Sequence, residues 1–69
     1  MNVSIKLKTR NIFDIDSRVA EVAAIREWIL ELVEWDDTKF EMRYHSSGER
    51  LVVWFDEDRH AMLFKLKWL

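Results

Sequence analysis

The sequence predicts an α+β domain whose elements follow the order strand, helix, strand, strand, helix. Three short segments alternate apolar and polar residues, which indicates strands because successive side chains of a strand point to opposite faces. Two other segments repeat apolar residues three and four positions apart, which indicates amphipathic helices. The 69 residues contain one glycine, no proline and no internal repeat, so we expect a single domain over residues 1–69.

The first strand is predicted over residues 2–8 and the first helix from Ser17 to about Trp35. Apolar residues occupy alternate positions of the strand: Val3, Ile5 and Leu7. Side chains suited to a helix start come next: Asp14, Asp16 and Ser17. One face of the helix is apolar: Val22, Ile25, Ile29, Leu32 and Val33. Trp28 and Leu30 widen this face, so we expect the helix to contact the sheet and either a second element or a second subunit.

A hairpin is predicted from residues 39–45 and 50–55, which both alternate and are separated by a segment holding the only glycine, Gly48. Pairing His45 with Arg50 brings the apolar residues of both strands to one face. The resulting pairs are Tyr44 with Leu51, Met42 with Val53, and Phe40 with Phe55. A slip of one residue would destroy this match, so the register is well determined.

A second helix is predicted after the acidic start Asp56-Glu57-Asp58. Apolar residues follow at helical spacing (Ala61, Phe64 and Trp68), with others beside them (Met62, Leu66 and Leu69). An alternative interpretation is a last strand over residues 64–68, where apolar residues alternate with lysines. We prefer the helix because Ala61 to Lys67 contains good helix formers and no β-branched residue.

A right-handed crossover between the first two strands leaves room for the third between them. The predicted fold is therefore a three-stranded antiparallel sheet in the order 1-3-2 with two helices on one face, which is a truncated ferredoxin-like arrangement. A strand at residues 64–68 would nearly complete that fold. The predicted core consists of Ile5, Ile25, Ile29, Met42, Val53, Phe55 and Phe64.

Composition excludes several classes of site and location. The chain has no cysteine, which rules out disulfides and thiolate metal sites, and its net charge of −2 differs from the basic balance of most nucleic-acid-binding domains. No apolar run approaches the roughly 20 residues that span a bilayer. Residues 1–6 lack the pattern of a signal peptide. We therefore expect a cytoplasmic protein with no membrane contact.

No motif predicts a catalytic, cofactor or metal site. The serines lie outside any nucleophile motif, and one glycine cannot build a phosphate-binding loop. Neither His45 nor His60 has a partner histidine one helical turn away, and we expect both to be exposed. The acidic runs at residues 14–16 and 56–58 could attract a hard cation, but acids at a helix start also stabilise the helix dipole, which we prefer. We predict that the protein is not an enzyme.

The outer face of the sheet is the predicted partner-binding surface. Its candidate residues are Lys6, Lys8, Arg43, His45, Val52 and Trp54. In the order 1-3-2, Trp54 would lie on the central strand between Lys6 or Lys8 and Arg43. A tryptophan beside an arginine is typical of protein interfaces, so we predict a protein partner. A single-stranded nucleic acid that stacks on Trp54 is the alternative, and a structural or assembly subunit is a third.

Two further expectations concern the ends of the chain. Trp68 and Leu69 could fold across the sheet and cover Trp54. Separately, the first strand has an unpaired edge over residues 3–8, where a target protein or a second copy of the chain could add a strand. The competing possibility is that residues 64–68 form a strand that pairs along this edge.

The C-terminal third resembles the ending of many small proteins of tailed phages. The segments that carry the resemblance are Leu51-Val52-Val53-Trp54-Phe55, Ala61 and Phe64-Lys65-Leu66-Lys67-Trp68. This resemblance covers about the last 18 residues and implies a phage-type accessory protein in the host cytoplasm. Those proteins have no assigned function, so it implies no activity and no functional residues.

Overall fold

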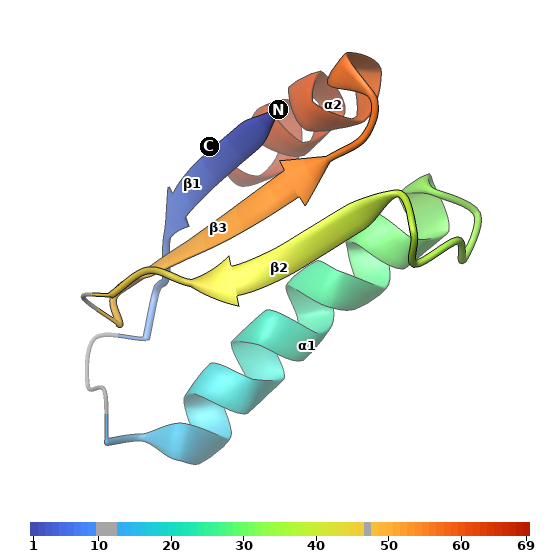
Figure 1. The fold of residues 1–69 in the computed structure, drawn as a ribbon. Coiled ribbons are helices and arrows are strands. Elements are labelled where there is room, and N and C mark those ends of the chain that lie inside the picture. Colours follow the sequence, from blue (N-terminus) through green and yellow to red (C-terminus); the bar gives the residue numbers. More distant parts are fainter. Residues whose placement is uncertain (10–12, 47) are drawn as a thin grey trace.

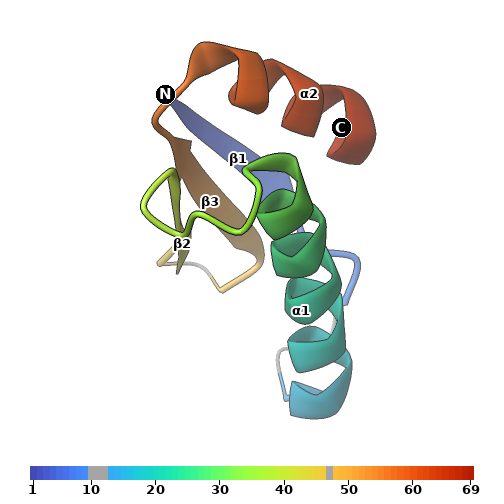
Figure 2. The ribbon, with the colours of Figure 1, turned by 90° about the vertical axis from the view of Figure 1, so that its right-hand side faces the viewer.

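The structure is a computed structural model and describes residues 1–9, 13–46 and 48–69. In these residues one antiparallel sheet has the strand order β1-β3-β2, and two helices cover one of its faces (Figure 1). The elements are β1 (Asn2–Lys6), α1 (Ile15–Leu32), β2 (Phe40–Tyr44), β3 (Arg50–Phe55) and α2 (Asp58–Trp68). Figure 2 shows both helices on the same side of the sheet, with α2 crossing near the end of α1. The predicted α+β fold and strand order are confirmed.

The predicted register of the hairpin is confirmed for every pair. Tyr44 lies opposite Leu51, and Met42 lies opposite Val53. The His45 amide donates to the carbonyl of Arg50 at 2.9 Å, which closes the ladder next to the turn. β1 pairs with the other side of β3, so the inward side chains of all three strands meet the helices.

The core lies between the sheet and the two helices, and every element contributes to it. Its buried apolar residues are Val3, Ile5, Leu7, Ile25, Ile29, Val33, Phe40, Leu51, Val53, Phe55, Ala61 and Phe64. The predicted core is therefore correct except at Met42, which is half-buried against the core from β2 at the edge of the sheet.

Helix α1 begins two residues earlier and ends three residues earlier than predicted. Asp14 is its N-cap, and the Asp14 carboxylate accepts the amide of Ser17 at 3.3 Å. At the other end, Glu34 and Trp35 have φ values of 56° and 64°. These left-handed conformations end the helix and leave Trp35 exposed. None of the helical segments in the described part of the chain is long and apolar enough to cross a membrane.

The C-terminal segment is a helix, so the alternative of a last strand is wrong. Helix α2 lies on the same side of the sheet as α1, where Phe64 and Trp68 contact Trp28 of α1. It therefore neither covers Trp54 nor fills the edge of β1. Trp28, which widens the apolar face of α1, packs against α2. It is therefore not available to contact a second subunit.

Candidate functional site

The sheet face, which is the side of the sheet away from the helices, carries three rows of side chains. From β1 across β3 to β2 the rows are Asn2–Trp54–Glu41, Ser4–Val52–Arg43 and Lys6–Arg50–His45. Trp54 is 39% exposed. A shallow cavity of about 330 Å³ lies beside it, lined by Asn2, Glu41, Arg43, Val52 and Trp54.

The predicted neighbours of Trp54 are wrong. Trp54 lies between Asn2 and Glu41, because the antiparallel register places Lys6 opposite Arg50. Arg50 is four residues from Trp54 on β3, which is about 13 Å along an extended strand. The flanking charge next to the indole is therefore an acid and not a lysine.

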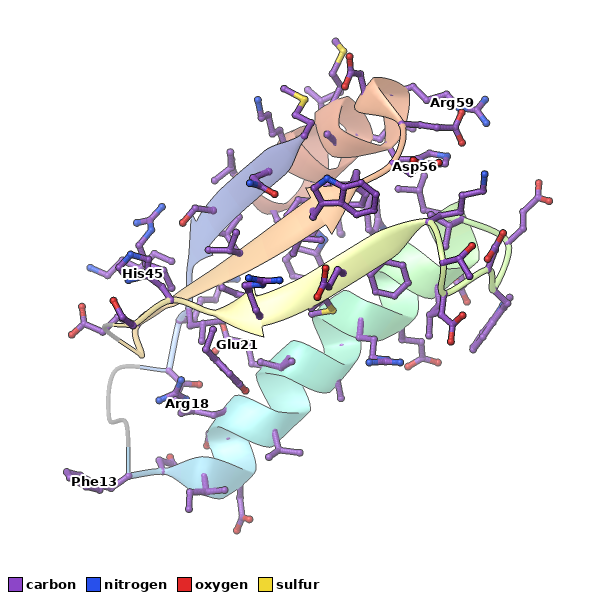
Figure 3. All side chains as sticks on the ribbon, viewed as in Figure 1. Phe13, Arg18, Glu21, His45, Asp56 and Arg59 are labelled. Atoms are coloured by element: carbon purple, nitrogen blue, oxygen red, sulfur yellow. The ribbon has the colours of Figure 1, made fainter. Side chains whose placement is uncertain are left out.

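The structure brings only part of the predicted surface together. Arg43, Val52 and Trp54 share the cavity on the sheet face. Lys6 and His45 lie in the row at the hairpin end, where Figure 3 labels His45. Lys8 lies outside the sheet because β1 ends at Lys6, and its amide donates to Glu21 of α1.

The two guanidinium groups of the sheet face already bind neighbouring oxygens. Arg43 Nη2 lies 3.1 Å from Glu41 Oε1. Arg50 Nε donates to Ser4 Oγ at 2.8 Å, and its Nη2 donates to the Ser4 carbonyl at 3.1 Å. We did not predict a role for Arg50, although the alternation through Val52 and Trp54 places it on this face. A guanidinium carries five N–H donors, so these contacts use only part of the donor capacity of each group.

The outer edge of β1 has no strand beside it in the described residues. Met1 and Phe55 exchange backbone hydrogen bonds across β1 and β3, and the amide of Leu7 donates to the carbonyl of Glu49. By the alternation of an antiparallel ladder, the peptide groups of even-numbered residues such as Ser4 point to the open edge. The Arg50 guanidinium donates a hydrogen bond to the Ser4 carbonyl. An added strand would compete with Arg50 for this carbonyl, so the edge is less suited to pairing with another strand.

His60 is buried, so the prediction that it is exposed is wrong. Only 6% of this residue is exposed, and it lies on the inner side of α2 one turn before Phe64. Its Nδ1 is 3.7 Å from Glu57 Oε2, which is too long for a hydrogen bond, and it has no other partner among the described residues. The spacing of His60, Phe64 and Trp68 was the signal that could have predicted this burial.

A cavity of about 450 Å³ opens beside His60, between the end of α1 and the start of α2. It is lined by Leu32, Val33, Glu34, Asp36, Lys39, Glu57, Arg59 and His60. Figure 3 shows Asp56 and Arg59 at this end of the molecule, opposite the hairpin end. Nowhere in residues 1–9, 13–46 and 48–69 do three histidine, aspartate or glutamate side chains gather as metal ligands would.

The charges around this cavity are largely matched with one another. Arg59 Nε lies 3.1 Å from Glu57, and Lys39 Nζ lies 3.7 Å from Asp56. The Asp36 carboxylate accepts the hydroxyl of Thr38 at 2.6 Å and its amide at 3.1 Å. These hydrogen bonds hold the pKa of Asp36 below its ordinary value. We therefore interpret the cavity as the junction of two turns and not as a ligand site.

The outer side of α2 carries four large, exposed apolar side chains. We call it the α2 apolar face, and it consists of Met62, Leu63, Leu66 and Leu69, which are 60%, 45%, 82% and 72% exposed. Met62, Leu66 and Leu69 follow one another at intervals of four and three residues, so they lie in one stripe. The amide of Leu69 donates to the carbonyl of Lys65 at 2.9 Å, which continues the helical path to the last residue.

The opposite side of α2 already supplies the core with Ala61 and Phe64. In the sequence, Met62, Leu66 and Leu69 lie beside these core residues, and we did not predict that they form a separate, exposed stripe. The helix is thus apolar on two opposite sides, of which one is covered.

Comparison with known proteins identifies no relative: no family model, curated protein or solved structure matches the chain.

Proposed function

We propose that the protein acts by binding another protein and that the α2 apolar face is the main contact. The observation that supports this is the concentration of four large, exposed apolar side chains on one side of an 11-residue helix and its C-cap. Contiguous exposed apolar patches on proteins in water mark interaction surfaces, whereas single exposed apolar residues need no explanation. Burial of such surface favours association, and the loss of translational and side-chain freedom on binding offsets part of this gain.

Ordinary packing does not account for this face. The inner side of α2 already fills the space under the sheet with Phe64 and Trp68. Leu66, which is the most exposed of the four, lies on the outer side and could be polar at no cost to the core. An amphipathic helix that presents methionine and leucine to a groove or a second helix is a common mode of protein recognition.

A pair of matched variants tests the proposal. Leu66→Glu places a charge in the middle of the α2 apolar face, and Val19→Glu places the same charge at an exposed apolar position of α1. Both positions are exposed, so both variants should fold, which circular dichroism checks. Cross-linking in the native host should capture the same partner with the wild type and with Val19→Glu, but not with Leu66→Glu. Equal capture of that partner by Leu66→Glu would show that the proposal is wrong.

Single-stranded nucleic acid on the sheet face is the second candidate function. The exposed indole of Trp54 beside Arg43 favours it, because indoles stack on bases. The carboxylate of Glu41 disfavours it, since Glu41 neighbours Trp54 and holds Arg43. Titration with an oligonucleotide at low salt should leave the protein fluorescence unchanged. Quenching that salt reverses and that Trp54→Leu abolishes would favour nucleic acid instead.

The role of a structural or assembly subunit is a form of the same protein-binding function. In either form we propose that the protein performs no catalysis. The phage-type origin and the cytoplasmic location stay predictions.

A further inference from the structure

We infer that the open edge of β2 pairs with β2 of a second copy of this chain, so that the two sheets join across a two-fold axis. The inference goes beyond the proposed function and does not depend on it, because α2 packs against β1 and β3, whereas β2 forms the opposite edge of the sheet. A two-fold interface uses the same patch on both subunits, so the patch must be complementary to itself. The backbone and the charges of β2 both meet that requirement.

The outer edge of β2 presents a row of unpaired peptide groups. β2 lies at one end of the strand order, so within the described residues only β3 pairs with it (Figure 1). The amide of His45 donates to the carbonyl of Arg50 on β3. By the alternation of an antiparallel ladder, the peptide groups of odd-numbered residues in β2 also bind β3, and those of even-numbered residues point to the open edge. These outward groups belong to Phe40, Met42 and Tyr44.

β2 lacks the features by which edge strands avoid pairing with other chains. It contains no proline, glycine or lysine, and its register against β3 is continuous, without a bulge. In the part of the chain that the structure describes, no side chain forms a hydrogen bond with its outward peptide groups. At the edge of β1, in contrast, Arg50 donates to the Ser4 carbonyl. The expected contact with a second copy therefore moves from β1 to β2.

The peptide groups and the charges of β2 together select one register. Hydrogen-bonded pairs must join even-numbered residues of both copies, because only their peptide groups point outward. A two-fold axis centred on Met42 satisfies this condition and places Glu41 opposite Arg43 of the second copy. An axis centred on Glu41 or on Arg43 would place like charges opposite each other, which destabilises an antiparallel pair. The Met42 register also pairs every residue of β2 from Phe40 to Tyr44.

In this register Glu41 and Arg43 of both copies form a ring of alternating charge on the sheet face. Within one copy, Arg43 Nη2 already lies 3.1 Å from Glu41 Oε1. The two side chains are 69% and 62% exposed, so each can meet an opposite charge of the second copy without leaving its own partner. They also occupy non-hydrogen-bonded pairs, in which opposite side chains lie closest together.

The inner side of the same register is apolar. Tyr44, which is 50% exposed in the single chain, lies opposite Phe40 of the second copy. Met42, which is half-buried, lies opposite its own counterpart. Aromatic pairs across neighbouring strands stabilise antiparallel sheets. Pairing with a second copy thus covers the apolar side chains that the edge of β2 leaves partly exposed.

Sedimentation equilibrium of the full chain over micromolar to millimolar concentration tests the inference. The wild type should rise from 8.4 kDa towards twice that mass. Leu66→Glu should do the same, because Leu66 lies on α2 and not on β2, and this separates the inference from the proposed function. A wild type that stays monomeric over the whole range overturns the inference, and so does a dimer that Leu66→Glu abolishes.

Charge reversal tests the register. Arg43→Glu and Glu41→Arg each turn the opposite pairs into like charges, and each should weaken dimerisation by about tenfold. The double variant Glu41→Arg/Arg43→Glu restores opposite charges and should recover most of the wild-type affinity. Arg59→Glu is a matched control, since Arg59 also lies 3.1 Å from a glutamate two residues before it and its side chain is 73% exposed. It should dimerise like the wild type, and a double variant as weak as the single ones overturns the Met42 register.

Amide hydrogen exchange measured by NMR at low and high protein concentration tests the backbone contact. The amides of Glu41 and Arg43 bind β3 and should be protected at both concentrations. The amides of Phe40, Met42 and Tyr44 should exchange rapidly in the monomer and about tenfold more slowly or less in the dimer, because dimerisation gives them partners. If exchange of these three amides does not slow as the dimer forms, β2 is not the contact and the inference is wrong.

Discussion

The indole rings of Trp28 and Trp68 meet edge to face, with centroids 6.3 Å apart and planes at 89°. Trp28 belongs to α1 and Trp68 to the last turn of α2, and both also contact Phe64. Edge-to-face pairs are favoured because the positive edge of one ring meets the negative face of the other. These rings hold the two helices together on the side of α2 opposite its apolar face, so the stability of α2 depends on them.

Trp68→Ala should lower the free energy of unfolding by about 3–5 kcal/mol, because it removes a large ring from the contact between the helices. Trp68→Phe should cost much less. It keeps a ring in place and removes Trp68 Nε1, which is buried and has no hydrogen-bond partner in the described residues. Urea unfolding of both variants measures the difference. Equal losses would mean that the indole nitrogen has a partner that holds Trp68 in place.

His60→Leu should leave the free energy of unfolding unchanged or raise it. The leucine keeps most of the buried volume and removes Nδ1, which lacks a partner and therefore costs desolvation energy in the folded state. His60→Ala is the control for volume and should be destabilising by about 2 kcal/mol or more. If thermal unfolding showed His60→Leu to be as unstable as His60→Ala, the imidazole would have a role that packing does not explain.

The fold could be predicted from the sequence because one side of each strand meets the core. Alternation in residues 39–45 and 50–55 determined the register, since any slip would turn Met42 and Val53 to water. The prediction of a helix rather than a strand at the C-terminal end followed from the good helix formers in Ala61 to Lys67. The end of α1 could not be predicted, because apolar Trp35 continues the helical pattern although its backbone has left the helix.

The candidate site was harder to predict than the fold. Trp54 was correctly placed on the sheet face, but its neighbours depend on the register of β1 against β3. This register places Asn2 opposite Trp54, whereas Lys6 and Lys8 lie towards the hairpin end. The α2 apolar face was missed because both sides of α2 are apolar. Phe64 was correctly predicted in the core, where it contacts Phe55 of β3 and Trp28 of α1. The sequence pattern does not say how far Met62, Leu66 and Leu69 on the other side of the helix are exposed.

Gly48→Ala should lower the free energy of unfolding by about 1 kcal/mol, because Gly48 has a φ of 75° and residues with a Cβ rarely adopt this conformation. The cost comes from the backbone alone, since an added Cβ would lie 3.8 Å from Arg18 Nη1 in ordinary contact. Gly48→Asn should cost less, because asparagine tolerates the left-handed region. Ser46→Ala is the control in the same turn, and urea unfolding compares the three.

Two charged side chains near the start of α1, Arg18 and Glu21, bind this helix to neighbouring segments of the chain. Arg18 donates to the carbonyl of Gly48 and lies over the ring of Tyr44, with 5.1 Å from its guanidinium carbon to the ring centroid. One turn later, the Glu21 carboxylate accepts the amides of Lys8 and Thr9 and the hydroxyl of Thr9. Figure 3 labels both Arg18 and Glu21 on the part of α1 near the hairpin. Together these contacts fix the start of α1 against the segment that follows β1 and against the hairpin.

Glu21→Gln should destabilise the protein at neutral pH but not at low pH. Burial raises the pKa of Glu21, but the hydrogen bonds from Lys8 and Thr9 and the charge of Lys8 outweigh it, so its pKa lies below the ordinary 4.5. The ionised carboxylate therefore adds stability above about pH 4.5, and this contribution is lost as the pH falls through the lower pKa of the folded state. We expect a difference of about 1 kcal/mol at pH 7, limited by partial exposure.

Urea unfolding at several pH values measures the difference between wild type and Glu21→Gln. Glu27→Gln, at an exposed glutamate of the same helix, is the control and should differ little from wild type at any pH. The gap between wild type and Glu21→Gln should close as the pH is lowered from 5 towards about 3, because protonation removes the charge that the two amides bind. A gap that stays constant over this range would mean that Glu21 stabilises the chain through packing and not as a carboxylate.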